Sequence, residues 1–116
     1  ISGDGGFMFN VQELSTAVAH RIDVVTIVFA DKAFGNVKRF QKENYGERYI
    51  AVDLHNPDFV ALAHSFGMTG IRAETPDALR AALREAFAAP GPALIEVPVG
   101  EMTSIWTLIQ RPSSSA

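Results

Sequence analysis

Apolar residues recur along the chain at two spacings, one typical of helices and the other typical of buried strands. After Asn10, the residues Val11, Leu14, Val18 and Ile22 follow at steps of three and four, which predicts a helix with one apolar face. Asn10 and a glutamate three positions later suit a capping pair, so this helix is expected to begin just after a run of glycines.

Two further helices are predicted by a cap residue followed by proline, at Asn56-Pro57 and at Thr75-Pro76. Gly67 is the expected end of the first of these two helices. A shorter helix is expected over residues 34–42. The apolar stripes of the two proline-capped helices are Phe59, Val60, Ala63 and Phe66, and then Leu79, Ala82, Leu83, Ala86 and Phe87.

Short β-branched runs lie between these helices, at residues 23–30, 50–54, 69–73 and 92–99. The continuous apolar character of residues 24–30 is typical of a strand that is buried on both faces. Alternating helices and strands predict an α/β fold with a mostly parallel sheet and helices on both faces. A further strand should precede the glycines, where only two residues stand, so the fold is expected to lack its N-terminal strands.

Composition narrows the function classes. The formal net charge is -3 with acidic and basic residues interspersed, which argues against a nucleic-acid partner. The chain has no cysteine, so it offers no thiolate metal site and is compatible with a reducing cytoplasm. The longest apolar run is far shorter than the roughly 20 residues that span a bilayer. We therefore expect a soluble, cytoplasmic protein with no membrane partner.

The most unusual stretch is the run Gly3, Asp4, Gly5 and Gly6 at a predicted strand end before a helix. Glycines let backbone amides approach a phosphate, and a following helix dipole favours an anion. A carboxylate would repel phosphate unless a hard cation such as Mg²⁺ or Ca²⁺ bridged the two. The alternative is a tight strand-to-helix turn in which Asp4 is solvated or acts as a cap.

A second strand end carries the stretch "FADKAFGNVKRFQ", in which Asp31 directly follows the buried strand. One helix and one strand separate this aspartate from Asp4, so the two loops should lie side by side. With 24 residues between Gly5 and Ala30, the two stretches resemble the GDG and Asn-Asn motifs of thiamine diphosphate-dependent enzymes, in their acetolactate synthase-like group. The stretches "GGFMFNVQELSTA" and "ALIEVPVGEM" add to this resemblance, which extends to about residue 102.

The resemblance implies a binding domain for thiamine diphosphate and Mg²⁺ over residues 1–102 and a C-terminal arm over residues 103–116. Asp4 and Asp31 would bind Mg²⁺ through their side chains, and Ala33 through its backbone carbonyl. The sequence departs from the motif at Ala30, where Asn is usual, and at Lys32, where Gly is common. The implied cofactor-binding residues are Gly3, Asp4, Gly5, Gly6, Asp31, Ala33, Phe34 and Gly35, and the implied substrate-facing residues are Asn36, Val37 and Phe40.

The resemblance also implies a carboligase or decarboxylase that acts on 2-keto acids as a homodimer or homotetramer. The glutamate that contacts the aminopyrimidine ring comes from a pyrimidine-binding domain of a neighbouring subunit, so no catalytic residue is assigned here and the chain alone is expected to be inactive. Some members also bind FAD through another domain. Two alternatives stay open: a separate small subunit of a two-chain decarboxylase, and a degenerate binding or assembly module. The basic residues Lys38, Arg39 and Lys42 are interpreted as a solvated helix face, with subunit contacts as the alternative.

Overall fold

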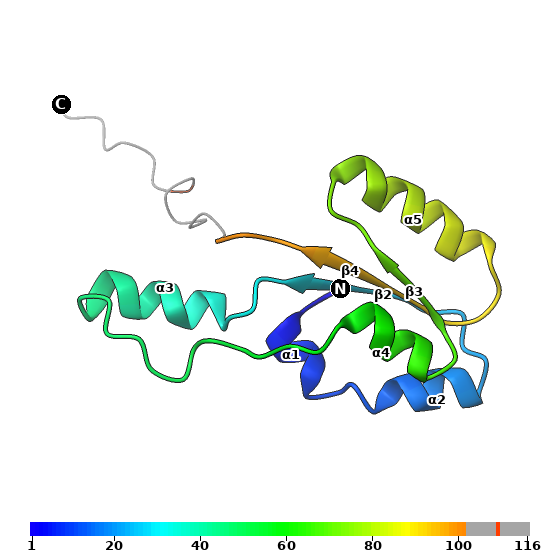
Figure 1. Ribbon diagram of the computed structural model, residues 1–116, viewed down its shortest axis with the longest axis horizontal. Coiled ribbons are helices and arrows are strands. Elements are labelled where there is room, and N and C mark those ends of the chain that lie inside the picture. The colour runs from blue at the N-terminus through cyan, green and yellow to red at the C-terminus, as the bar shows by residue number, and fades with distance from the viewer. Residues whose placement is uncertain (102–108, 110–116) are drawn as a thin grey trace.

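The computed structural model describes residues 1–101 and Ile109, so the predicted arm lies almost wholly outside the described residues. Strands and helices alternate along the described part of the chain (Figure 1). The elements are β1 (Ser2–Gly3), α1 (Asp4–Met8), α2 (Glu13–Ala19), β2 (Val25–Ala30), α3 (Gly35–Asn44), α4 (Phe59–Ser65), β3 (Thr69–Arg72), α5 (Pro76–Ala88) and β4 (Ala93–Pro98).

The strands form one parallel sheet in the order β1-β2-β4-β3. Ser2 of β1 pairs with Val28 of β2, and β4 pairs with both β2 and β3. This arrangement confirms the α/β fold class with a parallel sheet. Parallel strands place all their carboxyl ends at one edge of the sheet, which is where ligands bind in open α/β folds.

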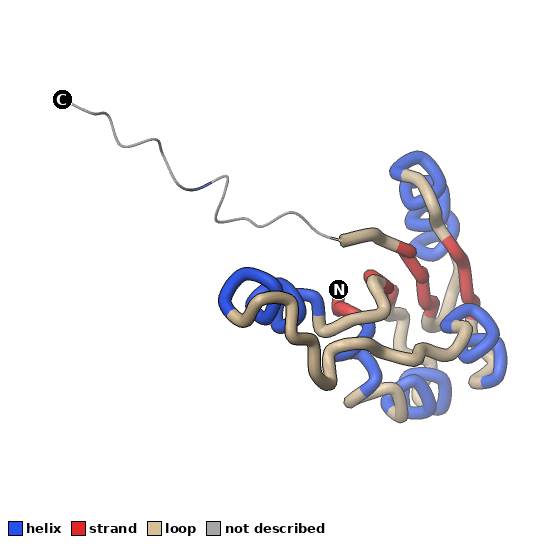
Figure 2. The backbone as a smooth tube through the Cα atoms, turned by 60° about the vertical axis from the view of Figure 1, so that its left-hand side comes forward, coloured by secondary structure: helices blue, strands red, loops and turns tan. Residues whose placement is uncertain are grey.

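Helices cover both faces of the sheet, as predicted (Figure 2). On one face, α1, α2 and α4 pack over a core that includes Phe7, Val28 and Phe59, with Phe7 and Phe59 edge to face. On the other face, α5 packs over Ile95 and its neighbours. In the described part of the chain, every helix is too short or too polar to cross a membrane.

Local sequence signals set several helix ends. The Thr75 side chain accepts a hydrogen bond from the Ala78 amide, and Pro76 follows it in the first turn of α5, as the sequence predicts. Gly67 has a φ of +80° just after α4, which explains why glycine ends that helix. These two ends are confirmed.

Other expected boundaries are wrong. The residues Asp4–Met8 form a helix directly, so the glycines are not a loop before a helix at Asn10. The cap of α2 is Gln12, without a side-chain hydrogen bond. The cap of α4 is Asp58 and not Asn56. The Asp58 side chain accepts a hydrogen bond from the Ala61 amide, and this bond lowers the pKa of the Asp58 carboxyl.

Two apolar residues do not lie on the buried faces that periodicity predicts for them. Ile22 is beyond the end of α2 and is exposed, and Phe87 is exposed on α5. The neighbouring alanines Ala82 and Ala86 are buried instead. The close approach of α5 to the sheet therefore uses small side chains, and the phenyl ring points outside the core.

The predicted strand at residues 50–54 is also wrong. Ala51 has a φ of +54°, which a strand does not accommodate. The segment instead joins the loop after β2, where Ala33 and Asp53 form an isolated antiparallel bridge. The Phe34 amide donates to the Val52 carbonyl and the Leu54 amide donates to the Lys32 carbonyl, both at 2.8 Å. The segment therefore supports the loop that carries Asp31 and adds nothing to the sheet.

Candidate functional site

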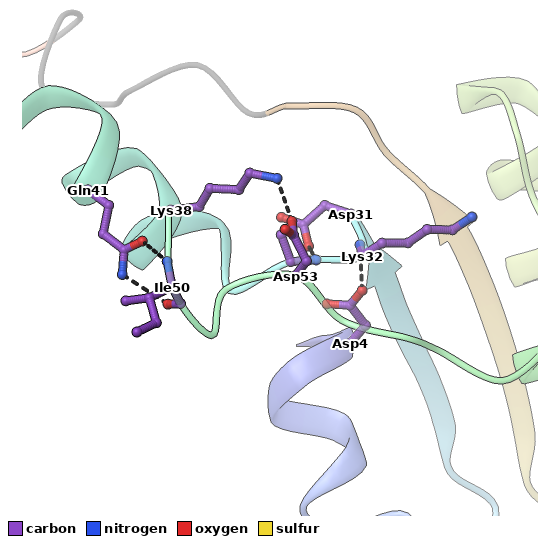
Figure 3. A network of polar contacts seen from close by, with 8 residues as sticks. Asp4, Asp31, Lys32, Lys38, Gln41, Ile50 and Asp53 are labelled. Atoms are coloured by element: carbon purple, nitrogen blue, oxygen red, sulfur yellow. Dashed lines mark hydrogen bonds and ion pairs between the residues drawn. The ribbon is translucent and has the colours of Figure 1, made fainter. Parts of the chain in front are cut away.

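The two aspartates singled out in the sequence lie at the ends of neighbouring strands. Asp4 follows β1 and Asp31 follows β2, and these two strands pair in parallel register. The expectation that the two loops lie side by side is confirmed. Figure 3 shows both carboxylates in one cluster above the start of α1.

Asp4 is a buried carboxylate with three hydrogen-bond donors. Its side chain is 1% exposed. Oδ1 accepts a bond from the Gly5 amide at 2.8 Å, while Oδ2 accepts bonds from the Lys32 amide at 2.8 Å and from the Asn56 side-chain amide at 2.6 Å. Asp4 is therefore neither solvated nor a surface helix cap, which corrects the alternative interpretation.

Asp31 occupies a less favourable position for a negative charge. Burial raises the pKa of its carboxyl group, and the nearby Asp4 carboxylate adds to that increase. The amide of Ala33, 3.1 Å from Oδ1, acts in the opposite direction. Two carboxylates held this close repel one another, and a bound cation would relieve the repulsion.

Two glycines at the site have no room for a side chain. A Cβ on Gly5 would lie 2.5 Å from the Phe34 ring, and a Cβ on Gly35 would lie 2.5 Å from Oδ2 of Asp31. Neither glycine has a positive φ, so space rather than backbone conformation requires glycine here. The glycines hold the two strand-end segments in contact.

Lys32 adopts a φ of +59°, the left-handed conformation that costs little only for glycine. This explains why glycine is common at that position of the motif. Its backbone amide bonds Asp4, while its exposed side chain points away from both aspartates (Figure 3). The substitution therefore preserves the loop and places no charge between the aspartates.

The aspartates open into a cavity of about 690 Å³ at the carboxyl edge of the sheet. All the residues for which the resemblance implies cofactor binding line this cavity. They are Gly3, Asp4, Gly5, Gly6, Asp31, Ala33, Phe34 and Gly35. The helices α1 and α3 begin at Asp4 and Gly35, so both start at the cavity.

The three residues expected to face substrate are not all at the cavity. Asn36 and Val37 line it, but Phe40 lies one turn further along α3 and packs against Tyr45, with ring centroids 5.8 Å apart. Phe40 is not among the lining residues and is half exposed.

Several lining residues were not assigned a role from the sequence. Lys38, Arg39 and Lys42 line the cavity from α3, and Lys38 and Lys42 are also open to solvent, as their interpretation as a solvated helix face predicts. All three form ion pairs: Lys38 with Asp53 at 2.6 Å, Lys42 with Glu101 at 3.1 Å, and Arg39 with Glu43 at 3.9 Å. These three residues lie on one face of α3, and α3 begins four residues after Asp31. That spacing is the sequence signal that could have placed them at the cavity.

Asn56 was also missed, because the sequence favoured it as a helix cap. The chain brings it back to Asp4 across 52 positions, which no local pattern reveals. In the described part of the chain, His, Asp and Glu side chains do not form a group of three that could hold a metal by themselves. A cation between Asp4 and Asp31 therefore needs further oxygen ligands from the backbone or from a bound molecule.

Comparisons with known proteins agree with this geometry. Acetolactate synthase of Bacillus subtilis (strain 168) is 46% identical over 99 residues, which cover 85% of this chain and 17% of that protein. The large subunit of acetolactate synthase isozyme 2 of Escherichia coli (strain K12) is 35% identical over 117 residues, which cover 100% of this chain and 21% of that protein.

A solved structure shares the fold. The crystal structure of benzoylformate decarboxylase from Polynucleobacter necessarius superposes with a TM-score of 0.80 at 30% identity, covering 88% of this chain and 19% of that one. The chain thus spans about a fifth of the length of these relatives. Residues 1–97 match the family described as thiamine pyrophosphate enzyme, C-terminal TPP binding domain, and the chain belongs to that family.

Proposed function

We propose that the cavity binds the diphosphate group of thiamine diphosphate through a Mg²⁺ ion. Asp4 and Asp31 would hold the cation through their carboxylates, and Ala33 through its backbone carbonyl. The single observation that carries the proposal is the buried Asp4 carboxylate beside Asp31, whose pKa is raised by burial and by the Asp4 charge. This pair provides hard oxygen ligands of the kind that Mg²⁺ prefers.

The surrounding residues fit a diphosphate as well as a cation. The amides of the first turn of a helix have no backbone acceptor within that helix, and both α1 and α3 begin at the cavity, although the Gly5 amide already donates to Asp4. Gly6 leaves its side of the cavity open, since a Cβ there would meet only the Ser2 hydroxyl, at 3.3 Å. Lys38, Arg39 and Lys42 line one wall, each paired with an acidic side chain that a phosphate would have to replace.

For the whole protein, we propose a carboligase or decarboxylase that acts on 2-keto acids. When bound, thiamine diphosphate supplies the electron sink for loss of carbon dioxide. This chain orients the diphosphate end of the cofactor, and Asn36 and Val37 extend the cavity wall toward the substrate. Phe40 is left out of this wall because it does not line the cavity.

The remaining parts of the site would come from elsewhere. We propose that a pyrimidine-binding domain of a neighbouring subunit completes it, in a cytoplasmic homodimer or homotetramer, and that any FAD is held by another domain. Residues 1–101 offer no carboxylate at the cavity that is free for the aminopyrimidine, since Asp4, Asp31 and Glu101 are already engaged.

The test is cofactor binding by the complete encoded polypeptide. We expect calorimetry to show that thiamine diphosphate binds with Mg²⁺ and fails to bind when Mg²⁺ is chelated. Asp31→Ala should remove the cation dependence, whereas Asp77→Ala, at an exposed position in the first turn of α5, should leave it intact. Equal binding with and without Mg²⁺ would refute the proposed cation site. Pyruvate and benzoylformate, as two 2-keto acids of different size, then test turnover.

A further inference from the structure

Asn56 donates a hydrogen bond to Asp4 although it is not one of the residues that line the cavity. Its side-chain nitrogen is 2.6 Å from Oδ2 of Asp4, and the residue is half buried and is not among those that line the cavity. The cap of α4 is Asp58, so the Asn56 side chain is not needed to start that helix. Its contact with Asp4 therefore calls for its own explanation.

The hydrogen bonds distinguish the two oxygens of Asp4. A carboxylate oxygen has about two lone-pair sites. Oδ2 accepts from both the Lys32 amide and the Asn56 side chain, so its sites are filled. Oδ1 accepts only from the Gly5 amide and keeps one site open. A cation at Asp4 would thus find a single available oxygen.

We infer that Asn56 is a positioning residue that makes Asp4 a one-oxygen ligand and thereby favours Mg²⁺ over Ca²⁺. Mg²⁺ requires a near-ideal octahedral shell, whereas Ca²⁺ is larger and commonly takes both oxygens of a carboxylate. Holding Oδ2 away from the cation therefore suits the smaller ion. This inference rests on the proposed cation site between Asp4 and Asp31.

The conformation of the loops around Asp4 does not depend on the hydrogen bond from Asn56. Backbone bonds from Phe34 to Val52 and from Leu54 to Lys32 already join the two segments. The Lys32 amide would still hold Oδ2 from one side after loss of Asn56. Removing the Asn56 amide should therefore free one lone-pair site of Oδ2 while the loops stay in place.

The experiment compares cation preference in the complete encoded polypeptide. Thiamine diphosphate binding is titrated with Mg²⁺ and separately with Ca²⁺ in the original protein, in Asn56→Ala, and in Asn56→Leu, which keeps the branched shape of the side chain but removes its donor. Asn44→Ala is the matched control, because Asn44 is exposed at the end of α3 and bonds only the Phe40 carbonyl. Thermal unfolding without ligands shows whether each variant folds.

We expect both Asn56 variants to lose about 10–100-fold in apparent Mg²⁺ affinity, the range typical for loss of a partner that orients a metal ligand. Ca²⁺ affinity should fall by less, so the preference for Mg²⁺ decreases, and the control should match the original protein. An equal loss of Mg²⁺ and Ca²⁺ affinity in the Asn56 variants, or no loss of either, would overturn the inference. The proposed cation site itself would still stand. Absence of any cation-dependent binding in the original protein would overturn the proposed function, and this inference with it.

Discussion

Two glycine-to-alanine substitutions should separate the stability of this domain from cation binding. Gly35 is the first residue of α3, and an added Cβ would lie 2.5 Å from Oδ2 of Asp31. Gly70 is in β3, away from the cavity, and an added Cβ would lie 2.8 Å from the backbone carbonyl oxygen of Val60. Both distances are far below the 3.4 Å at which ordinary contact begins.

The neighbours that must move differ in kind. At Gly35 a carboxylate can rotate away, so Asp31 would lose its bond from the Ala33 amide, and alanine would favour the helix. These opposing effects, a loss of about 1.5–3 kcal/mol for a charged hydrogen bond and a gain of at most about 0.5–1 kcal/mol for the helix, leave a net loss of about 0.5–2.5 kcal/mol. At Gly70 the obstacle is backbone, and overpacking should cost about 1–3 kcal/mol.

Cation binding should separate the two variants more clearly than stability does. Rotation of Asp31 removes a carboxylate from the proposed site, so Gly35→Ala should weaken Mg²⁺-dependent binding of thiamine diphosphate at least about tenfold, equivalent to about 1.4 kcal/mol. Gly70→Ala should leave this affinity unchanged. The assays are urea unfolding in the presence of a chelator and calorimetric titration with Mg²⁺. Loss of affinity in Gly70→Ala equal to that in Gly35→Ala would refute the reasoning, because general destabilisation would then explain both.

Three further predictions follow from single positions. Lys32→Gly should raise the free energy of unfolding by about 0.5–1 kcal/mol, because glycine relieves the strain of the left-handed φ of +59°. A lower urea midpoint in this variant would contradict the prediction. Phe59→Ala should lower that free energy by about 3–5 kcal/mol, since the ring is fully buried against Phe7, and a loss under 1 kcal/mol would show that the core collapses around the gap. Because the pKa of Asp31 is raised in the folded state, this carboxyl binds more protons in the native than in the unfolded chain between pH 3.8 and its folded pKa, so its contribution to cation-free stability should be lost as pH rises through that folded pKa. Asp31→Asn should remove that part of the pH dependence in urea unfolding from pH 4 to pH 7, and an unchanged profile would show that Asp31 is not its source.

Local patterns determined much of this protein. The alternation of helical and β-branched segments predicted the parallel α/β fold, and Thr75 and Gly67 marked real helix ends because caps and positive φ act over a few residues. The spacing of the two motifs placed Asp4 and Asp31 together, since the carboxyl ends of neighbouring parallel strands share one edge. The sequence therefore determined the fold class and the central pair of the site.

Tertiary structure alone decided the rest. The segment at residues 50–54 has strand-like residue types, yet Ala51 turns it out of the sheet to support the loop after β2. Asn56 looks like a cap in sequence, but the fold brings its amide to Asp4 from 52 positions away. The basic face of α3 borders the cavity only because that helix starts beside Asp31. Periodicity reports the environment of neighbouring residues, whereas these contacts depend on how distant segments pack, which no local spacing encodes.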